Sequence, residues 1–557
     1  MPLRLVLWLV VPCLAGGALG VSFASRPAPS PVQVAAPQMQ VVRRTALPPA
    51  RVYRDTHLRP GLMALPASTA APSTLLGTSA STAAAPAAGQ SDVMAFTPGD
   101  RAFAESASPG PTETTPFTTS TPGTSTEPTP TTTVSTTPIT ISDVHTVSLM
   151  PFSATIAWRT SEPVASRIAY GLGTPTLWSA DGPAALEHVA EVAGLTSSSS
   201  WNVWVTAHAD DGRTATEPFM LTTPPLTGGV TASTEGGAFR INAQPYFPTI
   251  VWNACPDALP KLMSLGIDLF MANACGNASE QAPVITGRGF ALSNARKAPE
   301  SGAVGTYLPD EWDTFLPGNL TADAAHKLAP SNGAPGPRFL TLTNHFYSRA
   351  EPLPQGRGMY PALIEIADVV GFDLYPLQNW CRWESFGDVF ESQRELVTLA
   401  RGRPTFQWIE ARHMDCHDPK LDPSPDTVRA ETWLAIAGGA HAIGYFPNDW
   451  SAEVDSEIAR SKREIQSLVP ALLEPAIAAQ ASNPQIKVSA RIHNGALYVI
   501  AVNSSRTAAT ASFNVPLLAD RGLVSLAGDR ATVAAGGAFS DTFAPLEARV
   551  YVSPPSA

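Results

Sequence analysis

Short stretches in which apolar and polar residues alternate make up two parts of the chain, residues 139–225 and 484–557. The first contains runs such as SATIAWRT and WNVWVTA, and the second contains IKVSARIH and ALYVIAVN. Alternation with a period of two, broken by turn residues every ~8–12 positions, predicts half-buried β-strands joined by tight turns. We therefore predict a β-sandwich in each of these segments.

The stretch between them, residues 239–475, has short apolar runs that alternate with segments of helical periodicity. Eight such runs occupy residues 247–254, 267–274, 289–295, 304–311, 338–346, 369–376, 404–411 and 440–447. Eight strands alternating with helices over about 235 residues fit a (β/α)8 TIM barrel, whose typical length is ~250 residues. An open parallel sheet is the competing fold, but no glycine-rich phosphate-binding fingerprint follows the first run.

The N-terminal segment has the composition of an export signal followed by a linker. Residues 1–24 combine one basic residue, Arg4, with an apolar run and a small-residue exit, which is the pattern of a signal peptide. Residues 25–138 are dominated by Ala, Pro, Ser and Thr, so they bury too little apolar surface to offset their ordering entropy and we predict a disordered linker. We expect a secreted or cell-envelope (periplasmic) protein without an integral membrane span after signal cleavage, because no second apolar run approaches ~20 residues.

The charge balance is acidic, since 36 Lys and Arg residues stand against 47 Asp and Glu residues and the net charge is −11. Nucleic-acid binding needs a basic surface that displaces counterions from phosphates, so this balance argues against a nucleic-acid partner. The sequence has no Gly-x-Ser-x-Gly nucleophile elbow and no His-Glu-x-x-His zinc motif. Nothing in it requires a cofactor or a metal.

Four cysteines follow the predicted signal peptide: Cys255, Cys275, Cys381 and Cys416. An even number of cysteines in an exported chain favours disulfide bonds. We favour the pairing of sequence neighbours, 255 with 275 and 381 with 416. A metal site of Cys416 with nearby histidines is the weaker alternative, because the chain has no close Cys-x-x-Cys pair.

In a (β/α)8 barrel the functional residues lie at the carboxyl ends of the strands, so the ends of the eight apolar runs hold the candidates for a site. Sugars bind by stacking on aromatic rings while polar side chains meet their hydroxyl groups. The residues at or just beyond these run ends that we expect to bind substrate are Asn253, Asn273, Asp310, Trp312, Asn344, His345, Asp373, Tyr375, Trp380, Tyr445 and Trp450.

Two glutamates at run ends form a candidate catalytic pair. Glu311 ends the fourth run and Glu410 ends the seventh, so in a closed barrel both project into one mouth from opposite sides. Glycosidic cleavage needs one carboxylic acid to protonate the leaving oxygen and one carboxylate to attack or to activate water. Each glutamate alone could equally be a solvated loop charge or the partner of a nearby arginine.

This placement resembles the clan A glycoside hydrolases, in which the acid/base is a glutamate after strand four and the nucleophile is a glutamate after strand seven. The resemblance covers residues 239–475, and a C-terminal β-sandwich is a common companion of such barrels. It implies that Glu311 is the proton donor, that Glu410 is the nucleophile of a retaining mechanism, and that Tyr375 hydrogen-bonds a carboxylate. Asp310 departs from the family pattern, which commonly has Asn before the acid and uses it to contact the 2-hydroxyl of the sugar.

Residues 139–225 resemble a fibronectin type III module, which is an immunoglobulin-like β-sandwich. The resemblance rests on Trp158, Tyr170 and the Gly194-Leu195-Thr196 turn before the WNVWVTA strand. Trp201 stands where the family usually has a tyrosine whose hydroxyl bonds back to the chain. We expect this module to space or orient the barrel rather than to catalyse.

We therefore predict a multidomain, secreted glycoside hydrolase that cleaves O-glycosidic bonds of a polysaccharide or oligosaccharide by a retaining two-carboxylate mechanism. The alternative is a non-catalytic carbohydrate-binding or adhesive cell-surface protein built on a glycosidase-like barrel, to which the long Thr/Pro-rich segment is also suited. A purely structural cell-envelope protein is the third possibility.

Overall fold

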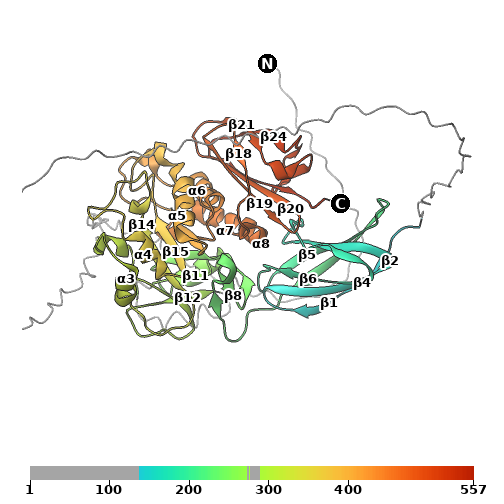
Figure 1. Cartoon of the computed structure of the whole chain (residues 1–557), viewed down its shortest axis with the longest axis horizontal. Helices are drawn as coiled ribbons and strands as arrows, with labels where there is room; N and C mark the ends of the chain where they lie inside the picture. Colours follow the sequence, from blue (N-terminus) through green and yellow to red (C-terminus); the bar gives the residue numbers. More distant parts are fainter. Residues whose placement is uncertain (1–136, 273–274, 276–288, 557) are drawn as a thin grey trace, which may run out of the picture. The chain divides into compact units, whose positions relative to one another are not determined.

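The structure is a computed structural model that describes residues 137–272, 275 and 289–556. All of these residues belong to one compact unit, residues 123–557. Along the chain, an antiparallel sheet comes first, a closed barrel follows, and two further antiparallel sheets come last (Figure 1).

Eight parallel strands close into a barrel, which confirms the TIM-barrel prediction. Each strand pairs with its sequence neighbours, and the last strand pairs with the first. In chain order the strands are β10 (Thr249–Trp252), β11 (Leu269–Met271), β12 (Phe290–Asn294), β13 (Ala303–Tyr307), β14 (Arg338–Thr343), β15 (Val369–Asp373), β16 (Thr405–Glu410) and β17 (Ala442–Phe446). Residues 295–302 join β12 to β13 without a helix, a short link for parallel neighbours.

Helices and short 3-10 turns follow most of the barrel strands (Figure 1). The helices are α1 (Leu259–Ser264), α3 (Ala322–Leu328), α4 (Tyr360–Glu365), α5 (Asp388–Ala400), α6 (Pro425–Gly438), α7 (Ala452–Gln466) and α8 (Val469–Leu472); the turns are η3 (Trp312–Phe315), η4 (Asn344–Phe346), η5 (Trp383–Ser385) and η6 (Pro419–Leu421). The sequence fixes both ends of α6, because Ser424 and Thr427 form a capping box and Gly439 ends the helix at φ 105°. Within the described ranges, no helix is long and apolar enough to cross a membrane.

Bulky aromatic rings fill the barrel, and two glycines provide the room for them. Phe406 and Trp408 of β16 belong to the buried cluster inside the barrel. Gly371 of β15 lies beside Phe406, and Gly444 of β17 lies beside Trp408. A Cβ atom at either glycine would stand 2.2 Å from the facing ring. The two glycines therefore set the positions of the rings beneath the mouth of the barrel.

The segment before the barrel forms a six-stranded antiparallel sheet. Its strands are β1 (Ile141–Leu149), β2 (Ser153–Gly171), β3 (Leu177–Trp178), β4 (Gly182–Ala193), β5 (Ser200–His208) and β6 (Thr214–Thr222), and a small sheet of β7 (Ala232–Ser233), β8 (Arg240–Ile241) and β9 (Gln244–Pro245) leads on to the barrel. Trp158, Tyr170 and Trp201 are buried in the core. Tyr170 donates to the carbonyl of Ala193 at 3.1 Å, whereas the indole N–H of Trp201 has no acceptor in the described chain. Assignment of this sheet to the fibronectin type III family stays a prediction.

Two antiparallel sheets follow the barrel. One contains β18 (Gln480–Ala481), β21 (Ala509–Asn514) and β24 (Ala538–Phe543); the other contains β19 (Ile486–His493), β20 (Ala496–Asn503), β25 (Ala548–Ser553), β22 (Gly522–Ser525) and β23 (Ala531–Val533). Leu497 and Tyr551 of the second sheet share a buried cluster with Phe513 and Phe539 of the first. Two sheets around one apolar core are the arrangement of a β-sandwich.

Arginines bind the carboxyl-terminal ends of the barrel helices. Arg491 of β19 is buried and donates to the carbonyl of Ile436 in the last turn of α6 at 2.7 Å. Arg403 donates to the carbonyls of Ala367, just beyond α4, and Ala400, at the end of α5. Because the end of a helix carries open acceptors and a partial negative charge, a guanidinium there satisfies both. Arg491 also joins α6 to the C-terminal sheets.

We expect Gly444→Ala to lower the stability of the chain, because its new methyl group would overlap the Trp408 ring. Overpacking of this kind costs ~1–3 kcal/mol of unfolding free energy, which thermal denaturation detects as a lower Tm. Gly522→Ala in β22 is the matched control, since a Cβ atom there meets nothing within 4 Å. Equal melting temperatures for the two variants would contradict this account of the barrel interior.

Candidate active site

Five acidic and phenolic residues lie at or just after the carboxyl ends of three barrel strands. Asp310 and Glu311 come after β13, Asp373 is the last residue of β15, Tyr375 follows two positions later, and Glu410 ends β16. The carboxyl ends of the strands form the functional rim of this fold. Their side chains nevertheless divide into two groups with different surroundings.

Glu311 and Asp373 form a pair of carboxyl groups joined by a side-chain hydrogen bond. Burial raises the pKa of Asp373 well above its usual range, and the nearby charges of Glu311, Asp310 and Asp313 raise it further. Two carboxylates in contact repel each other, so the pair retains a proton at neutral pH. The structure thus brings the predicted residue Glu311 next to Asp373, from a strand two places away in the barrel.

The backbone holds Glu311 in a restricted conformation. Its φ of 45° lies in the left-handed region, which is uncommon for a residue other than glycine. The N–H and hydroxyl of Thr314 both donate to the carbonyl of Glu311, at 3.1 and 2.7 Å. The sharp turn into η3 therefore aims this side chain towards Asp373.

Asp313 is a functional candidate that the sequence analysis missed. It is fully buried and accepts from the backbone N–H of Thr343 at 3.1 Å, from the hydroxyl of Thr343, and from the hydroxyl of Tyr360 at 3.0 Å. These bonds tie the segment that carries Glu311 to the end of β14 and to α4. The only sequence signal for this role is a third acidic residue in the run Asp-Glu-Trp-Asp.

Tyr375 lies at the centre of the acidic group. Its ring is buried and stacks on Phe446 at a centroid distance of 6.1 Å. Burial raises the pKa of its phenol well above the usual range, and the charges of Asp373, Asp310, Glu311 and Glu410 raise it further. One phenol therefore lies within electrostatic reach of all four carboxyl groups and stays protonated as a hydrogen-bond donor.

Aromatic side chains form the floor beneath these residues. The Trp252 ring makes edge contacts with Tyr307 at 5.5 Å and with Trp408 at 6.4 Å. Tyr307 accepts from the amide of Asn294 at 3.0 Å, and burial raises the pKa of its phenol to about 12. The mouth thus combines apolar ring surface with carboxyl groups, the two features that a sugar-binding site requires.

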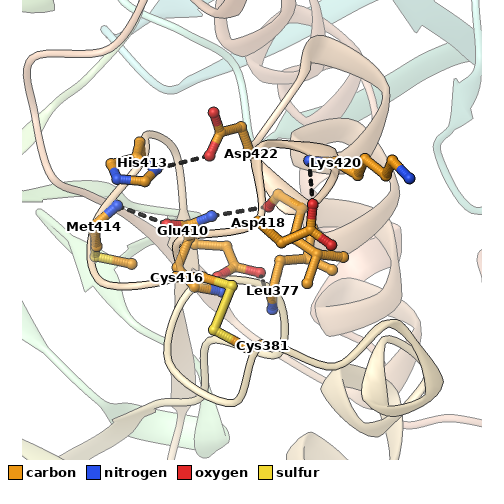
Figure 2. Close-up of a disulfide and its surroundings, with 11 residues drawn as sticks. Leu377, Cys381, Glu410, His413, Met414, Cys416, Asp418, Lys420 and Asp422 are labelled. Carbon is orange, nitrogen blue, oxygen red and sulfur yellow. Dashed lines mark hydrogen bonds and ion pairs between the residues drawn. A yellow bond between two sulfur atoms is a disulfide. The ribbon is translucent and has the colours of Figure 1, made fainter.

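Glu410 differs from the other predicted catalytic residue because its side chain is covered. It is 1% exposed, and its two carboxylate oxygens accept from the backbone N–H groups of Leu377 at 2.9 Å and Gln378 at 2.8 Å. Figure 2 shows its carboxylate beside Leu377 and the Cys381–Cys416 disulfide. A nucleophile must reach the substrate, and this carboxylate is instead enclosed by the loops after β15 and β16.

Glu431 of α6 lies against Glu410, and the sequence analysis missed it. It is 0% exposed, and its carboxyl group interacts with that of Glu410. Burial raises the pKa of Glu410 to about 7, and burial together with the Glu410 charge raises the pKa of Glu431 well above its usual range. The sequence signal for Glu431 is its place directly before the apolar run TWLAIAGG.

Both predicted disulfides are confirmed. Cys255 and Cys275 join the segments after β10 and β11, with 5.1 Å between Cα atoms. Cys381 and Cys416 join the loops after β15 and β16, with 5.5 Å between Cα atoms. Because Cys416 is bonded to sulfur, it is not a thiolate ligand for the metal site considered as an alternative. Within the described ranges, no group of three or more His, Cys, Asp or Glu residues is placed to hold a metal.

Three aromatic residues predicted to bind sugar are buried among other side chains. Trp312 and Trp450 are each 6% exposed, and the indole N–H of Trp450 donates to Asp455 at 2.7 Å. Tyr445 is 1% exposed and its hydroxyl bonds to Thr432 of α6 at 3.1 Å, because alternation along β17 turns it outward while Gly444 faces Trp408 inside the barrel. Rings covered in this way offer little surface for stacking on a sugar, and their predicted binding roles stay predictions.

The other predicted binding residues lie in various surroundings. Asn253 is exposed after β10, Asn344 is buried at the start of η4, and the imidazole of His345 bonds to the carbonyl of Glu351 at 2.6 Å. Trp380 is half-buried, with the guanidinium of Arg382 over its ring at 5.0 Å. Asn273 lies outside the described residues. Binding roles for these residues stay predictions.

Comparisons with known proteins assign no family, because no protein-family model and no curated protein matches the chain. Among solved structures, the chain is similar to a family 30 endoxylanase from Clostridium papyrosolvens, with 12% identity and a TM-score of 0.31 over 58% of this chain and 100% of that chain. It is also similar to a family 27 β-L-arabinopyranosidase from Geobacillus stearothermophilus (13% identity, TM-score 0.30, 54% of this chain and 61% of that chain) and to an Anoxybacillus α-amylase (8% identity, TM-score 0.33, 54% and 90%). Likenesses this low carry no argument about activity, and the fold is established by the strand pairing itself.

We expect Glu431→Gln to stabilise the chain progressively, relative to wild type, as the pH rises from 5 to 8. Raised carboxyl pKa values mean that stability present at low pH is lost as the pH rises through the folded-state pKa, here about 7 for Glu410. The variant has one fewer buried carboxyl group to ionise, so it loses less.

Thermal denaturation of both proteins across this range measures the effect as a difference in Tm. The difference is used because His441, whose pKa burial lowers to about 4, gives both proteins an opposite slope below pH 6.5. A pH-independent difference in Tm would contradict the ionisation of the Glu410–Glu431 pair.

Proposed function

We propose that this chain hydrolyses O-glycosidic bonds of a polysaccharide or oligosaccharide at the carboxyl end of its barrel. The observation that carries the proposal is the hydrogen-bonded carboxyl pair of Glu311 and Asp373 next to the exposed residue Asp310. Glycosidic cleavage needs a proton for the leaving oxygen and a second carboxylate for the sugar or the attacking water. This group of residues holds both.

The pair of Glu311 and Asp373 acts as the acid. Burial and the neighbouring negative charge raise the pKa of Asp373 and keep a proton on its carboxyl group at neutral pH, which is the condition for a general acid. Asp373 at the end of β15 passes this proton along the hydrogen bond to Glu311 on the segment after β13, and Glu311 delivers it to the leaving oxygen. The prediction that Glu311 is the proton donor is kept in this proposal.

Asp310 is the carboxylate that faces the substrate. It is exposed at the mouth, and its charge acts on both Asp373 and Tyr375. Glu410, predicted as the nucleophile, is enclosed and already accepts two backbone hydrogen bonds. Whether Asp310 attacks the sugar or activates water decides between retention and inversion, and NMR of the first-formed product distinguishes the two.

The aromatic floor and the disulfides agree with an extracellular glycan substrate. Trp252, which is half-buried, offers ring surface next to Tyr307 and Trp408. Disulfide bonds form in oxidising compartments, outside the cytosol. Polysaccharides of cell walls and envelopes are available in such compartments, so we propose an exported enzyme acting there.

We expect purified chain to release reducing sugar from at least one member of a panel of plant, algal and bacterial-envelope polysaccharides. Glu311→Gln and Asp373→Asn should each lower kcat by ~10²–10⁴-fold, because general acid catalysis contributes that much. Asp323→Asn is the matched control: its carboxylate pairs with Lys327 on the surface of α3, and its activity should equal that of wild type.

Three results would count against hydrolysis by this pair. Full activity in Asp373→Asn would remove Asp373 from the acid. Equal loss in Asp323→Asn would point to a general effect on folding. Binding of a glycan without any turnover by the wild-type chain would favour the carbohydrate-binding alternative.

A further inference from the structure

The loop after β15, residues 374–381, carries Tyr375 and is bonded at several points. The backbone N–H groups of Asn379 and Trp380 both donate to the carbonyl of Tyr375 at 3.0 Å. The side chain of Gln378 donates to the carbonyl of Leu421 at 2.8 Å and accepts from the N–H of Met414 at 2.6 Å. The Cys381–Cys416 disulfide adds a covalent link, so the loop is fastened to the segment after β16 (Figure 2).

Glu410, the last residue of β16, makes two further hydrogen bonds to this loop. Each of its oxygens receives one backbone N–H of this loop, from Leu377 and from Gln378. A carboxylate suits two diverging N–H donors because both of its oxygens accept and neither donates. Buried backbone donors without a partner destabilise a fold, so this carboxylate stabilises the loop in one conformation.

A buried carboxylate in this position needs compensation for its own charge. Among the described residues, no basic side chain shifts the pKa of Glu410, and the other carboxyl group that acts on it is Glu431. Glu431 is fully buried on α6, its two oxygens have no hydrogen-bond partner among the N–H and O–H groups of the described chain, and its carboxyl group interacts with that of Glu410. Ionising two adjacent buried carboxyl groups at once costs a large free energy. One of them therefore keeps its proton and donates a hydrogen bond to the other.

We propose that Glu431, as a carboxylic acid, donates a hydrogen bond to Glu410, and that this pair holds the 374–381 loop so that Tyr375 meets the Glu311–Asp373 pair. Glu410 is then a positioning residue and not the nucleophile. The part that concerns catalysis rests on the proposed function. The part that concerns the loop does not, because it is measured without substrate.

Hydrogen–deuterium exchange of residues 374–381, read by mass spectrometry on the full purified chain, tests the loop. Glu410→Gln should speed exchange by ~10-fold or more, because its amide nitrogen cannot accept one of the two N–H donors. Glu431→Gln should leave exchange within about twofold of wild type, since an amide N–H can donate to Glu410 as the carboxylic acid does.

Glu457→Gln is the matched control. Glu457 is also a buried glutamate on a barrel helix, but it forms ion pairs with Arg429 and Arg460. We expect no change in loop exchange from it. Unchanged exchange in Glu410→Gln, or an equal increase in Glu457→Gln, would overturn the role of the pair in holding the loop.

Kinetics on the substrate found by the polysaccharide panel test the catalytic part. A positioning role predicts that Glu410→Gln loses ~10–100-fold in kcat, as residues that orient a site commonly do, and that Glu431→Gln keeps kcat within about twofold. Glu431→Leu, which fills the space but cannot donate, should show the loss that the glutamine variant does not.

A nucleophile would behave differently. Glu410→Ala would then be almost inactive, and sodium azide would restore turnover with a glycosyl azide as product; that result would overturn the positioning role. Absence of turnover from the wild-type chain on every substrate would overturn the proposed function instead, while the exchange data would still decide whether Glu410 and Glu431 hold the loop.

Discussion

The carboxyl end of the barrel depends on burying acidic groups without basic partners. The nearby ion pairs join Arg349 to Asp388, Arg412 to Asp449, and His413 to Asp422. The two inner pairs, Glu311 with Asp373 and Glu410 with Glu431, are compensated by protons and by backbone N–H groups instead. A salt bridge in either place would lower the carboxyl pKa and remove the proton. The arrangement therefore keeps acid groups protonated at neutral pH, which is what the proposed chemistry at the first pair requires.

The opposite end of the barrel has the complementary arrangement. The barrel helices end there with open carbonyl groups and the negative end of their dipoles, and Arg403 and Arg491 donate to those carbonyls. Arg491 does so from within the C-terminal sheets, so the same bond caps α6 and fastens the following domain. At this end, Arg403 and Arg491 therefore lie where the backbone already supplies negative charge.

The sequence predicted the barrel well because the barrel is specified by local patterns. All eight apolar runs contain a strand, and the short spacing of the cysteines gave both disulfides. The sequence is less informative where a side chain's direction depends on the strand register, which no local pattern gives. Tyr445 ends an apolar run as Tyr375 does, yet it faces α6 because Gly444 takes the inward position beside Trp408. Trp312 and Trp450 stand in polar segments but fold back into the core.

The same limit explains the catalytic pair. From the sequence, Glu311 and Glu410 were equivalent, because both end apolar runs on strands that face one mouth. What separates them is contact with residues distant in the chain: Asp373, which is 62 positions from Glu311, and Glu431, which is 21 positions from Glu410 on a helix that reads as apolar. Each oxygen of the Glu410 carboxylate already accepts one backbone N–H, and the side chain is covered. Burial alone would leave its chemistry undecided, since active-site acids are often buried. The hydrogen bonds from the loop to Glu410 are the stronger reason for our proposal that Glu410 supports the site and that Glu311 takes part in its chemistry.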